Sequence, residues 1–155
     1  MRRLGLATSV LFAGLTVTGL VRPIPAEADQ EVTHLTQFTS PSGNIGCAII
    51  PAGAAGNFAA YARCDIQTRD WTPPPRPSTC PPVTGYGQGL EVSAGRPAEF
   101  VCAGDTSYSH SAALQYGDSI SAGVIRCTST ESAMLCLDTQ SGHGFSLARQ
   151  GYQLF

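Results

Sequence analysis

Six cysteines constrain the fold of this chain more than any other feature of its sequence. They stand at Cys47, Cys64, Cys80, Cys102, Cys127 and Cys136. An even number of cysteines in an exported chain indicates disulfide bonds, which form and persist outside the reducing cytosol. No two of them form a Cys-x-x-Cys pair, and His34, His110 and His143 show no ligand spacing toward any cysteine. We therefore expect no bound metal and no other cofactor.

Many pairings of the cysteines are possible, and the sequence alone does not choose among them. Nearest-neighbour pairing is the simplest hypothesis: Cys47 with Cys64, Cys80 with Cys102, and Cys127 with Cys136. The last pair has the best support. Its two cysteines are separated by eight residues, so two adjacent antiparallel strands would bring the sulfurs together across a hairpin.

The first 28 residues have the three-part organisation of a secretory signal peptide. Arg2 and Arg3 precede an apolar run, Leu4–Leu20, and the small residues Ala26 and Ala28 satisfy the cleavage rule. The run of 17 residues contains threonine, serine and glycine. It falls short of the roughly 18 apolar residues expected of a membrane-spanning helix. We predict cleavage after Ala28, general secretion to the extracellular space or cell envelope, and no transmembrane segment in the mature chain.

Residues 29–155 are predicted to form one secreted, disulfide-rich β domain, a size that suits a single hydrophobic core. This part contains six arginines, no lysine and ten acidic residues, which gives a formal charge of −4. A nucleic-acid-binding domain typically carries a basic patch or stripe. The composition therefore argues against a nucleic-acid partner, and we expect a monomer.

Short apolar runs broken by Ser, Thr, Gly and Asn predict strands and turns along the whole mature chain, and no window favours a helix. The expected fold class is all-β: a small antiparallel β domain of hairpins stapled by disulfides. Pro41–Asn44 predicts a turn that joins the first two strands. The strand candidates are Leu35–Thr39, Ile45–Ile50, Tyr61–Gln67, Ala98–Cys102, Val124–Thr128, Met134–Asp138 and Phe145–Arg149.

Two further segments bear on the organisation of the domain. Residues 72–82 contain six prolines, which predict an extended, exposed, polyproline-like loop. Residues 43–47 are weakly similar to residues 123–127, since both include a glycine, an isoleucine and a closing cysteine. Two cystine-bridged hairpins would explain this similarity, and so would chance.

His143 and Asp105 are the candidates for acid–base chemistry. His143 lies between two glycines, which leaves its imidazole accessible, and its ordinary pKa suits an acid or a base. With Ser107 or Ser146, these residues would form a small secreted hydrolase. The chain has no G-x-S-x-G elbow. A hairpin turn at His143 and a turn with an Asx-type cap at Asp105 explain the same residues without catalysis.

Trp71 and Arg76 are the candidates for protein binding. Trp71, the single tryptophan, stands directly before the proline-rich loop. It would form a binding ledge with the prolines or pack against the core beside a cystine. Arg76, held among prolines near Cys80, resembles the presented residue of a protease-inhibitor loop, in which rigidity lowers the entropy cost of binding. Pro77 directly after it argues against engagement of the cleavage type.

Four segments, Phe38–Cys47, Cys64–Ile66, Phe100–Thr106 and Ser141–Phe145, carry a family resemblance, and the first and last are the most specific. They resemble a family of secreted actinobacterial six-cysteine domains of unknown function, over roughly residues 35–155. The loop 129–133 departs from the pattern because it lacks a glycine. The resemblance implies an exported β domain in a bacterial envelope or extracellular setting, and it supplies no catalytic residue.

These observations favour a non-enzymatic extracellular or cell-envelope module with a binding or structural role. Its partner would be a protein, a wall component or a small ligand, contacted through the proline-rich loop and the His143 turn. The alternatives are a small hydrolase that uses His143 and Asp105, and an inhibitor-like binding loop around Arg76. The two main hypotheses differ in their response to His143→Ala, which would abolish hydrolysis and leave partner capture largely intact.

Overall fold

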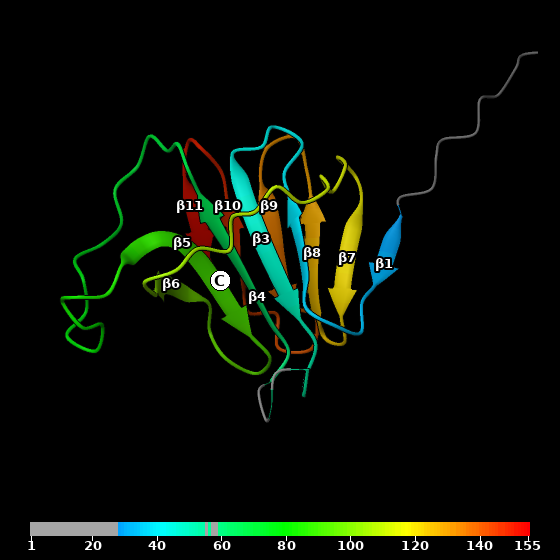
Figure 1. The fold of residues 1–155 in the computed structure, drawn as a ribbon, viewed down its shortest axis with the longest axis horizontal. Coiled ribbons are helices and arrows are strands. Elements are labelled where there is room, and N and C mark those ends of the chain that lie inside the picture. Colours follow the sequence, from blue (N-terminus) through cyan, green and yellow to red (C-terminus); the bar gives the residue numbers. More distant parts are fainter. Residues whose placement is uncertain (1–27, 55, 57–58) are drawn as a thin grey trace, which may run out of the picture.

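Two β-sheets packed face to face form the fold (Figure 1). The computed structural model describes residues 28–54, 56 and 59–155. The predicted signal peptide lies almost entirely outside this range. The described part contains strands and turns and no helix, so none that could cross a bilayer. The all-β prediction is confirmed.

The first sheet is an antiparallel meander of five strands in chain order, here called the first unit. Its strands are β2 (Thr36–Thr39), β3 (Ile45–Ile50), β4 (Tyr61–Ile66), β5 (Tyr86–Ser93) and β6 (Glu99–Cys102). The turn predicted at residues 41–44 joins β2 to β3. It is closed by a hydrogen bond from Gly43 N to Ser40 O, and Gly43 has a φ of +72°, a region that glycine enters without steric cost.

The second sheet contains a second antiparallel meander of five strands, here called the second unit. Its strands are β7 (Ser119–Ala122), β8 (Ile125–Ser129), β9 (Met134–Asp138), β10 (Gly144–Leu147) and β11 (Tyr152–Leu154). The short β1 (Asp29–Glu31) adds to β7 in parallel. Figure 1 shows the two sheets one behind the other. Between them β5 lies against β9 and β10, β4 against β8 and β3 against β7, so the two units cover one another's apolar faces.

Alternating side chains explain which face of each strand is buried. On β3 and β8 the residues Ile45, Cys47, Ile125 and Cys127 point between the sheets and are almost completely buried. The core also contains larger side chains from both units, namely Phe38, Ile49, Leu90, Val92, Ile120, Met134, Phe145 and Leu147. One continuous core therefore joins the two units.

Each of the seven strand predictions overlaps an observed strand, and two of them, Ile45–Ile50 and Met134–Asp138, match at both ends. The prediction missed β1, β5, β7 and β11. The omission of β5 matters most because it is a long strand of the first sheet. Its glycines weaken the strand signal. Gly89 is nevertheless needed there, since a Cβ would lie 2.0 Å from Cys64 O on the neighbouring strand.

All three predicted disulfides are present. Cys47–Cys64 joins directly opposed residues of β3 and β4, and Cys127–Cys136 does the same on β8 and β9. The Sγ atoms of Cys64 and Cys136 lie 3.8 Å apart, so the two buried cystines meet in the core between the sheets. The weak similarity of residues 43–47 and 123–127 thus corresponds to two cystine-bridged hairpins at equivalent places in the two units.

Candidate functional site

Asp105, one of the predicted site residues, lies in the loop that leaves β6 and crosses the outer face of the first unit. Its carboxylate is 81% exposed and accepts a hydrogen bond from Arg63 Nη1 at 2.8 Å. Its backbone oxygen accepts another from Arg63 Nη2 at 2.7 Å. The bonded Arg63 guanidinium lowers the pKa of Asp105 below its ordinary value. Asp105 therefore holds its loop against the sheet.

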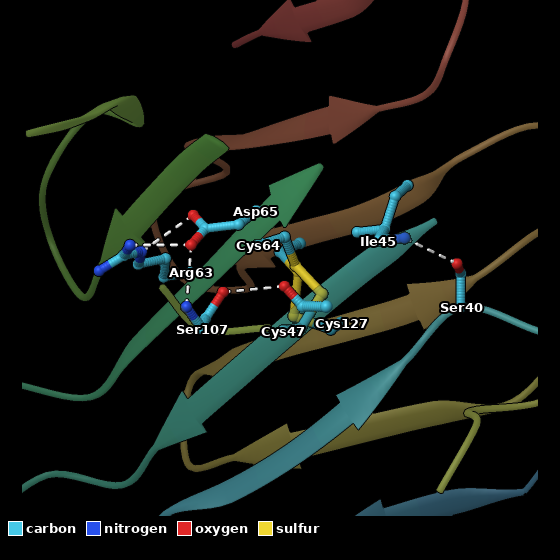
Figure 2. The surroundings of a disulfide bond; sticks show 10 residues. Ser40, Ile45, Cys47, Arg63, Cys64, Asp65, Ser107 and Cys127 are labelled. Carbon is cyan, nitrogen blue, oxygen red and sulfur yellow. Dashed lines mark hydrogen bonds and ion pairs between the residues drawn. A yellow bond between two sulfur atoms is a disulfide. The ribbon is translucent and has the colours of Figure 1, made fainter. Parts of the chain in front are cut away.

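Arg63 and Asp65 form the centre of this cluster on the outer face of β4 (Figure 2). Arg63 donates to both carboxylate oxygens of Asp65, at 3.0 and 2.8 Å, and both residues are buried. Asp65 Oδ2 also accepts Thr106 Oγ1 at 2.9 Å and Ser107 N at 2.8 Å. Burial alone would lower the pKa of Arg63, but its hydrogen bonds to Asp65 and Asp105 raise that pKa.

The loop closes over the sheet at Gly46. Ser107 Oγ donates to Gly46 O at 2.8 Å, and Tyr108 Oη donates to Gly43 O at 2.8 Å. A Cβ at Gly46 would lie 2.6 Å from Tyr108 Cα, so the loop needs glycine at this position. Beside the loop is a cavity of about 410 Å³, lined by Gln88 and Asp105 among others. The residues of the Arg63 cluster form hydrogen bonds with one another. These bonds hold the loop after β6 against the outer face of the first unit.

His143 lies in the turn between β9 and β10, on the other sheet. Its backbone oxygen accepts Asp138 N at 2.8 Å, its backbone nitrogen donates to Ser141 Oγ at 3.3 Å, and Gly142 has a φ of +76°. These features are those of the hairpin-turn interpretation. Among the described residues no hydrogen bond or ion pair joins His143 to Asp105, and Ser107 Oγ donates to Gly46 O. The structure does not bring the proposed Ser/His/Asp trio together.

The same turn contains a buried carboxylate that the sequence analysis did not single out. Asp138 accepts hydrogen bonds from Gly95 N at 2.8 Å, Gln140 N at 2.9 Å and Ser141 Oγ at 2.8 Å. Burial acts to raise the pKa of Asp138, but these hydrogen bonds outweigh it and lower the pKa to about 2. Because Gly95 belongs to the β5–β6 turn, Asp138 ties the second unit to the first.

Trp71 is partly buried against the hydrophobic core. Its Nε1 donates to Ala148 O at 2.9 Å, and its ring centroid lies 4.7 Å from that of Tyr152 and 6.2 Å from that of Phe100. The guanidinium of Arg69 stacks over the same ring at 4.6 Å. Trp71 thus joins the segment before the proline-rich loop to β6 and β11, which is the packing role considered for it.

Arg76 folds back onto its own loop. Its Nη1 donates to Pro81 O at 2.9 Å and to Thr84 O at 2.7 Å, and the guanidinium lies 5.4 Å from the ring centroid of Tyr86. The loop 72–82 contains no helix or strand, is exposed at most positions, and is fastened to β6 by Cys80–Cys102. The guanidinium of Arg76 therefore stabilises the loop from within.

A cavity of about 580 Å³ opens at the end of the sandwich where β2, β4, β8 and β10 finish. We call it the end cavity. Its rim is formed by the β2–β3 turn, the β8–β9 turn, the residues after β4 and β10, and Tyr116. Its floor includes Ile45 and Met134, both buried core residues. His143 lies at the opposite end of β9 and β10.

Hydrogen bonds between side chains and backbone hold the rim of the end cavity in place. Asn44 and Thr68 are joined by two hydrogen bonds of 2.8 Å, Nδ2 to Thr68 O and Thr68 N to Oδ1. On the other side, Thr130 Oγ1 donates to Ala133 O at 2.8 Å and accepts Ala133 N at 3.0 Å. These two hydrogen bonds close the β8–β9 turn. They explain how residues 129–133 form the turn without a glycine.

Ser129 is a buried polar residue in the wall of the end cavity. It lies on the inward face of β8, is 1% exposed and lines the cavity. Its Oγ has no hydrogen-bond partner among the described residues. The described residues contain one other buried side chain with an unpartnered polar atom, Gln88, which lines the smaller cavity beside the Arg63 cluster. Native proteins leave few buried polar groups unpaired, because an unpaired group costs roughly 1–3 kcal/mol. The Ser129 hydroxyl therefore has capacity for a hydrogen bond to a water molecule or a ligand in the end cavity.

Sequence reasoning missed the end cavity because its residues come from distant segments of the chain. The nearest signal was the turn at residues 41–44, which forms part of the rim. Within the described ranges, no group of three histidine, cysteine, aspartate or glutamate side chains is placed to hold a metal ion. The polar groups of the end cavity are mostly hydroxyls and amides.

Comparison with known proteins places the chain in a family. Residues 16–155, nearly its whole length, match the model of the family of unknown function DUF6636. The chain belongs to this family. No curated protein and no solved structure matches it. Membership of the family agrees with the predicted resemblance to domains of unknown function and brings no activity or substrate to the chain.

Proposed function

We propose that this protein is an exported, non-catalytic module that binds a small ligand in the end cavity. The observation that carries the proposal is the cavity itself. It has an apolar floor, a polar rim and the unpartnered Ser129 hydroxyl in its wall. Its volume of about 580 Å³ falls within the range of small-molecule sites, roughly 300–1,000 Å³.

Export is supported by the chemistry of the domain and by the start of its fold. All six cysteines are paired in disulfides, which persist in oxidising compartments. The strand β1 begins at Asp29, the first residue after the predicted cleavage site, so the mature chain would enter the second sheet with its first residues. We place the mature domain in the extracellular space or the cell envelope.

A binding role fits the arrangement of the candidate residues better than hydrolysis does. Asp105 is bonded to Arg63, Ser107 to Gly46, and His143 lies at the far end of the sandwich from the end cavity. General acid–base catalysis requires its groups within hydrogen-bonding reach of one another and of a substrate. We therefore propose no catalytic residue.

Ligand mapping by NMR tests the proposal. The oxidised chain starting at Asp29, labelled with ¹⁵N, is titrated with a library of small polar and apolar fragments. We expect amide shifts that cluster at Tyr116, Ser129 and Thr130 and spare the His143 turn. Esterase, peptidase and glycosidase substrates should show no turnover. Fragment shifts confined to other surfaces, or turnover that His143→Ala abolishes, would overturn the proposal.

A further inference from the structure

We infer that the end cavity binds a saccharide unit of one or two pyranose rings. The inference rests on the proposed binding function and names the chemical class of its ligand. It starts from the uncharged side chains of the rim, which are rich in oxygen: Ser40, Ser42, Asn44, Thr68, Thr130 and Ser132. Some of these hydroxyls bond one another, Ser40 with Ser42 at 3.0 Å and Thr130 with Ser132 at 3.1 Å, and each keeps capacity for a further hydrogen bond. A hydroxyl both donates and accepts hydrogen bonds, so a hydroxyl-lined wall suits a ligand that is itself covered with hydroxyls.

Charge in the cavity is limited. Glu131 and Arg149 have opposite charges, and Arg149 also forms an exposed ion pair with Asp70 at 3.4 Å. A strongly anionic ligand such as a phosphate would require a surplus of basic groups, and a cationic ligand a surplus of acids. The balance favours a neutral ligand, and the carboxylate of Glu131 can accept hydrogen bonds from its hydroxyls.

Apolar surface in the cavity matches the other face of a sugar ring. Ile45 and Met134 form part of the floor, and Tyr116 lies at the opening with 48% of its surface exposed. A pyranose has hydroxyls around its edge and C–H groups on its faces, so one face can lie on an aromatic ring while the edge binds polar groups. Tyr116 is held beside the floor because Gly117 N donates to Ser129 O at 2.8 Å.

Substitution of Ser129 provides a specific test of saccharide binding. The Oγ of Ser129 is buried and unpartnered, so replacing it by a methyl group removes an unsatisfied polar atom. If a sugar hydroxyl pairs with this oxygen, Ser129→Ala should raise the melting temperature of the free domain and weaken saccharide binding about fivefold. A serine with a merely structural role would not shift these two quantities in opposite senses.

The test titrates the oxidised domain with glucose, galactose, mannose, N-acetylglucosamine, maltose and diacetylchitobiose at millimolar concentrations, with amide shifts as the readout. We expect at least one of them to shift cavity residues. Tyr116→Ala should weaken that binding about tenfold, because the stacking surface is lost, and Tyr116→Phe should retain it. Tyr152→Ala is the matched control, since Tyr152 is 37% exposed and does not line the end cavity.

The outcomes separate this inference from the proposed function. If other fragments bind the end cavity and none of the six saccharides does, the saccharide inference is wrong and the binding function stands. If neither saccharides nor fragments shift cavity residues, both are wrong. Saccharide shifts that persist in Tyr116→Ala, or that map to the face around Trp71, would also overturn the inference.

Discussion

The two units of the sandwich share a cystine-bridged hairpin on their inner faces and differ on their outer faces. In each, a cystine joins directly opposed residues of the second and third strands, Cys47–Cys64 in the first and Cys127–Cys136 in the second. The second unit has short connections, the longest being residues 139–143, whereas the connection from β4 to β5 in the first runs over residues 67–85. The two units therefore share their cystine-bridged hairpins and differ in the lengths of their connections.

One pair of equivalent positions shows how the outer faces of the two units differ. The residue before the first cysteine is Gly46 in the first unit and Arg126 in the second. Gly46 leaves room for Tyr108, so a loop packs against the sheet there. Arg126 occupies the corresponding place with a side chain that is 40% exposed and pairs with Asp29 at 3.4 Å. The absence of a side chain at Gly46 leaves room for the loop, which is bonded to the buried Arg63–Asp65 ion pair of β4.

The largest expected difference between the units concerns their arginines. Arg63→Met leaves Asp65 buried without its partner, so we expect a loss of about 3–5 kcal/mol in the free energy of unfolding. Arg126→Met breaks an exposed pair and should cost about 0–1 kcal/mol. Urea denaturation of the two variants measures both values. Equal losses would mean that the Arg63 cluster does not fasten the loop.

The two equivalent cystines should contribute similar amounts. Replacing both cysteines of Cys47–Cys64 by alanine is expected to cost about 3 kcal/mol, because the cross-link restricts the unfolded chain. The Cys127–Cys136 pair spans 9 residues instead of 17, so its loss should cost about 0.5 kcal/mol less. Chemical denaturation of the two double variants under oxidising conditions provides the comparison. A difference of several kcal/mol would contradict the prediction that loop length in the unfolded chain sets the contribution of each cystine.

Asp138 links the units, and its effect should depend on pH. Its pKa in the folded protein is about 2, below the ordinary 3.8, so the folded state favours the ionised carboxylate. The resulting stability is fully present above about pH 4 and is lost as the pH falls toward 2. We expect Asp138→Asn to cost about 2 kcal/mol near neutral pH.

Melting curves recorded from about pH 7 down to pH 2 check this expectation. The variant and the wild type should converge at the acid end, because the wild-type carboxylate becomes protonated there. Gln140→Ala serves as the control, because Gln140 is an exposed neighbour that bonds to Asp138 only through its backbone nitrogen. A constant gap between Asp138→Asn and wild type over the whole range would contradict the assignment.

The smallest effects are expected at two buried serines, one in each half of the fold, and they should differ in sign. Ser107 donates to Gly46 O at 2.8 Å, so Ser107→Ala should cost about 1 kcal/mol. Ser129 has no partner among the described residues, so Ser129→Ala should stabilise the domain by about 0.5–1 kcal/mol. Differential scanning calorimetry resolves the two shifts. Destabilisation by both would mean that the Ser129 hydroxyl is paired in solution.

Some parts of the structure were accessible from sequence because they depend on residues close together in the chain. The pattern of apolar residues predicted the strands Ile45–Ile50 and Met134–Asp138 with their observed bounds. The Cys127–Cys136 hairpin was inferred from the short distance between its cysteines. By contrast, β5 was missed because Gly85, Gly87 and Gly89 resemble a loop. The tertiary structure explains these glycines by the close approach of neighbouring segments and, at Gly87, by a φ of +76°.

The candidate residues show the same limit. Asp105 was predicted to lie in a turn with an Asx-type cap. Nothing in its sequence surroundings indicated that its carboxylate accepts a hydrogen bond from Arg63, which lies 42 residues earlier and approaches it only when β4 and the loop pack together. The end cavity was even harder to predict from sequence, because its lining comes from several distant segments. Ser129 becomes a candidate only when its strand faces the β2–β3 turn across the core.

By itself, the sequence determined that the cysteines form disulfides, that the domain is all-β, and where most of the strands lie, because these depend on composition and on residues close together in the chain. Nearest-neighbour pairing of the cysteines was the simplest hypothesis, and the structure confirmed it. Only the tertiary structure decided where a ligand site would lie. The buried ion pair of Arg63 and the unpartnered hydroxyl of Ser129 arise when sheets and loops from distant parts of the chain meet. Burial raises the free-energy cost of leaving a serine hydroxyl or an arginine side chain unpaired, and these residues become buried only when the distant segments pack together.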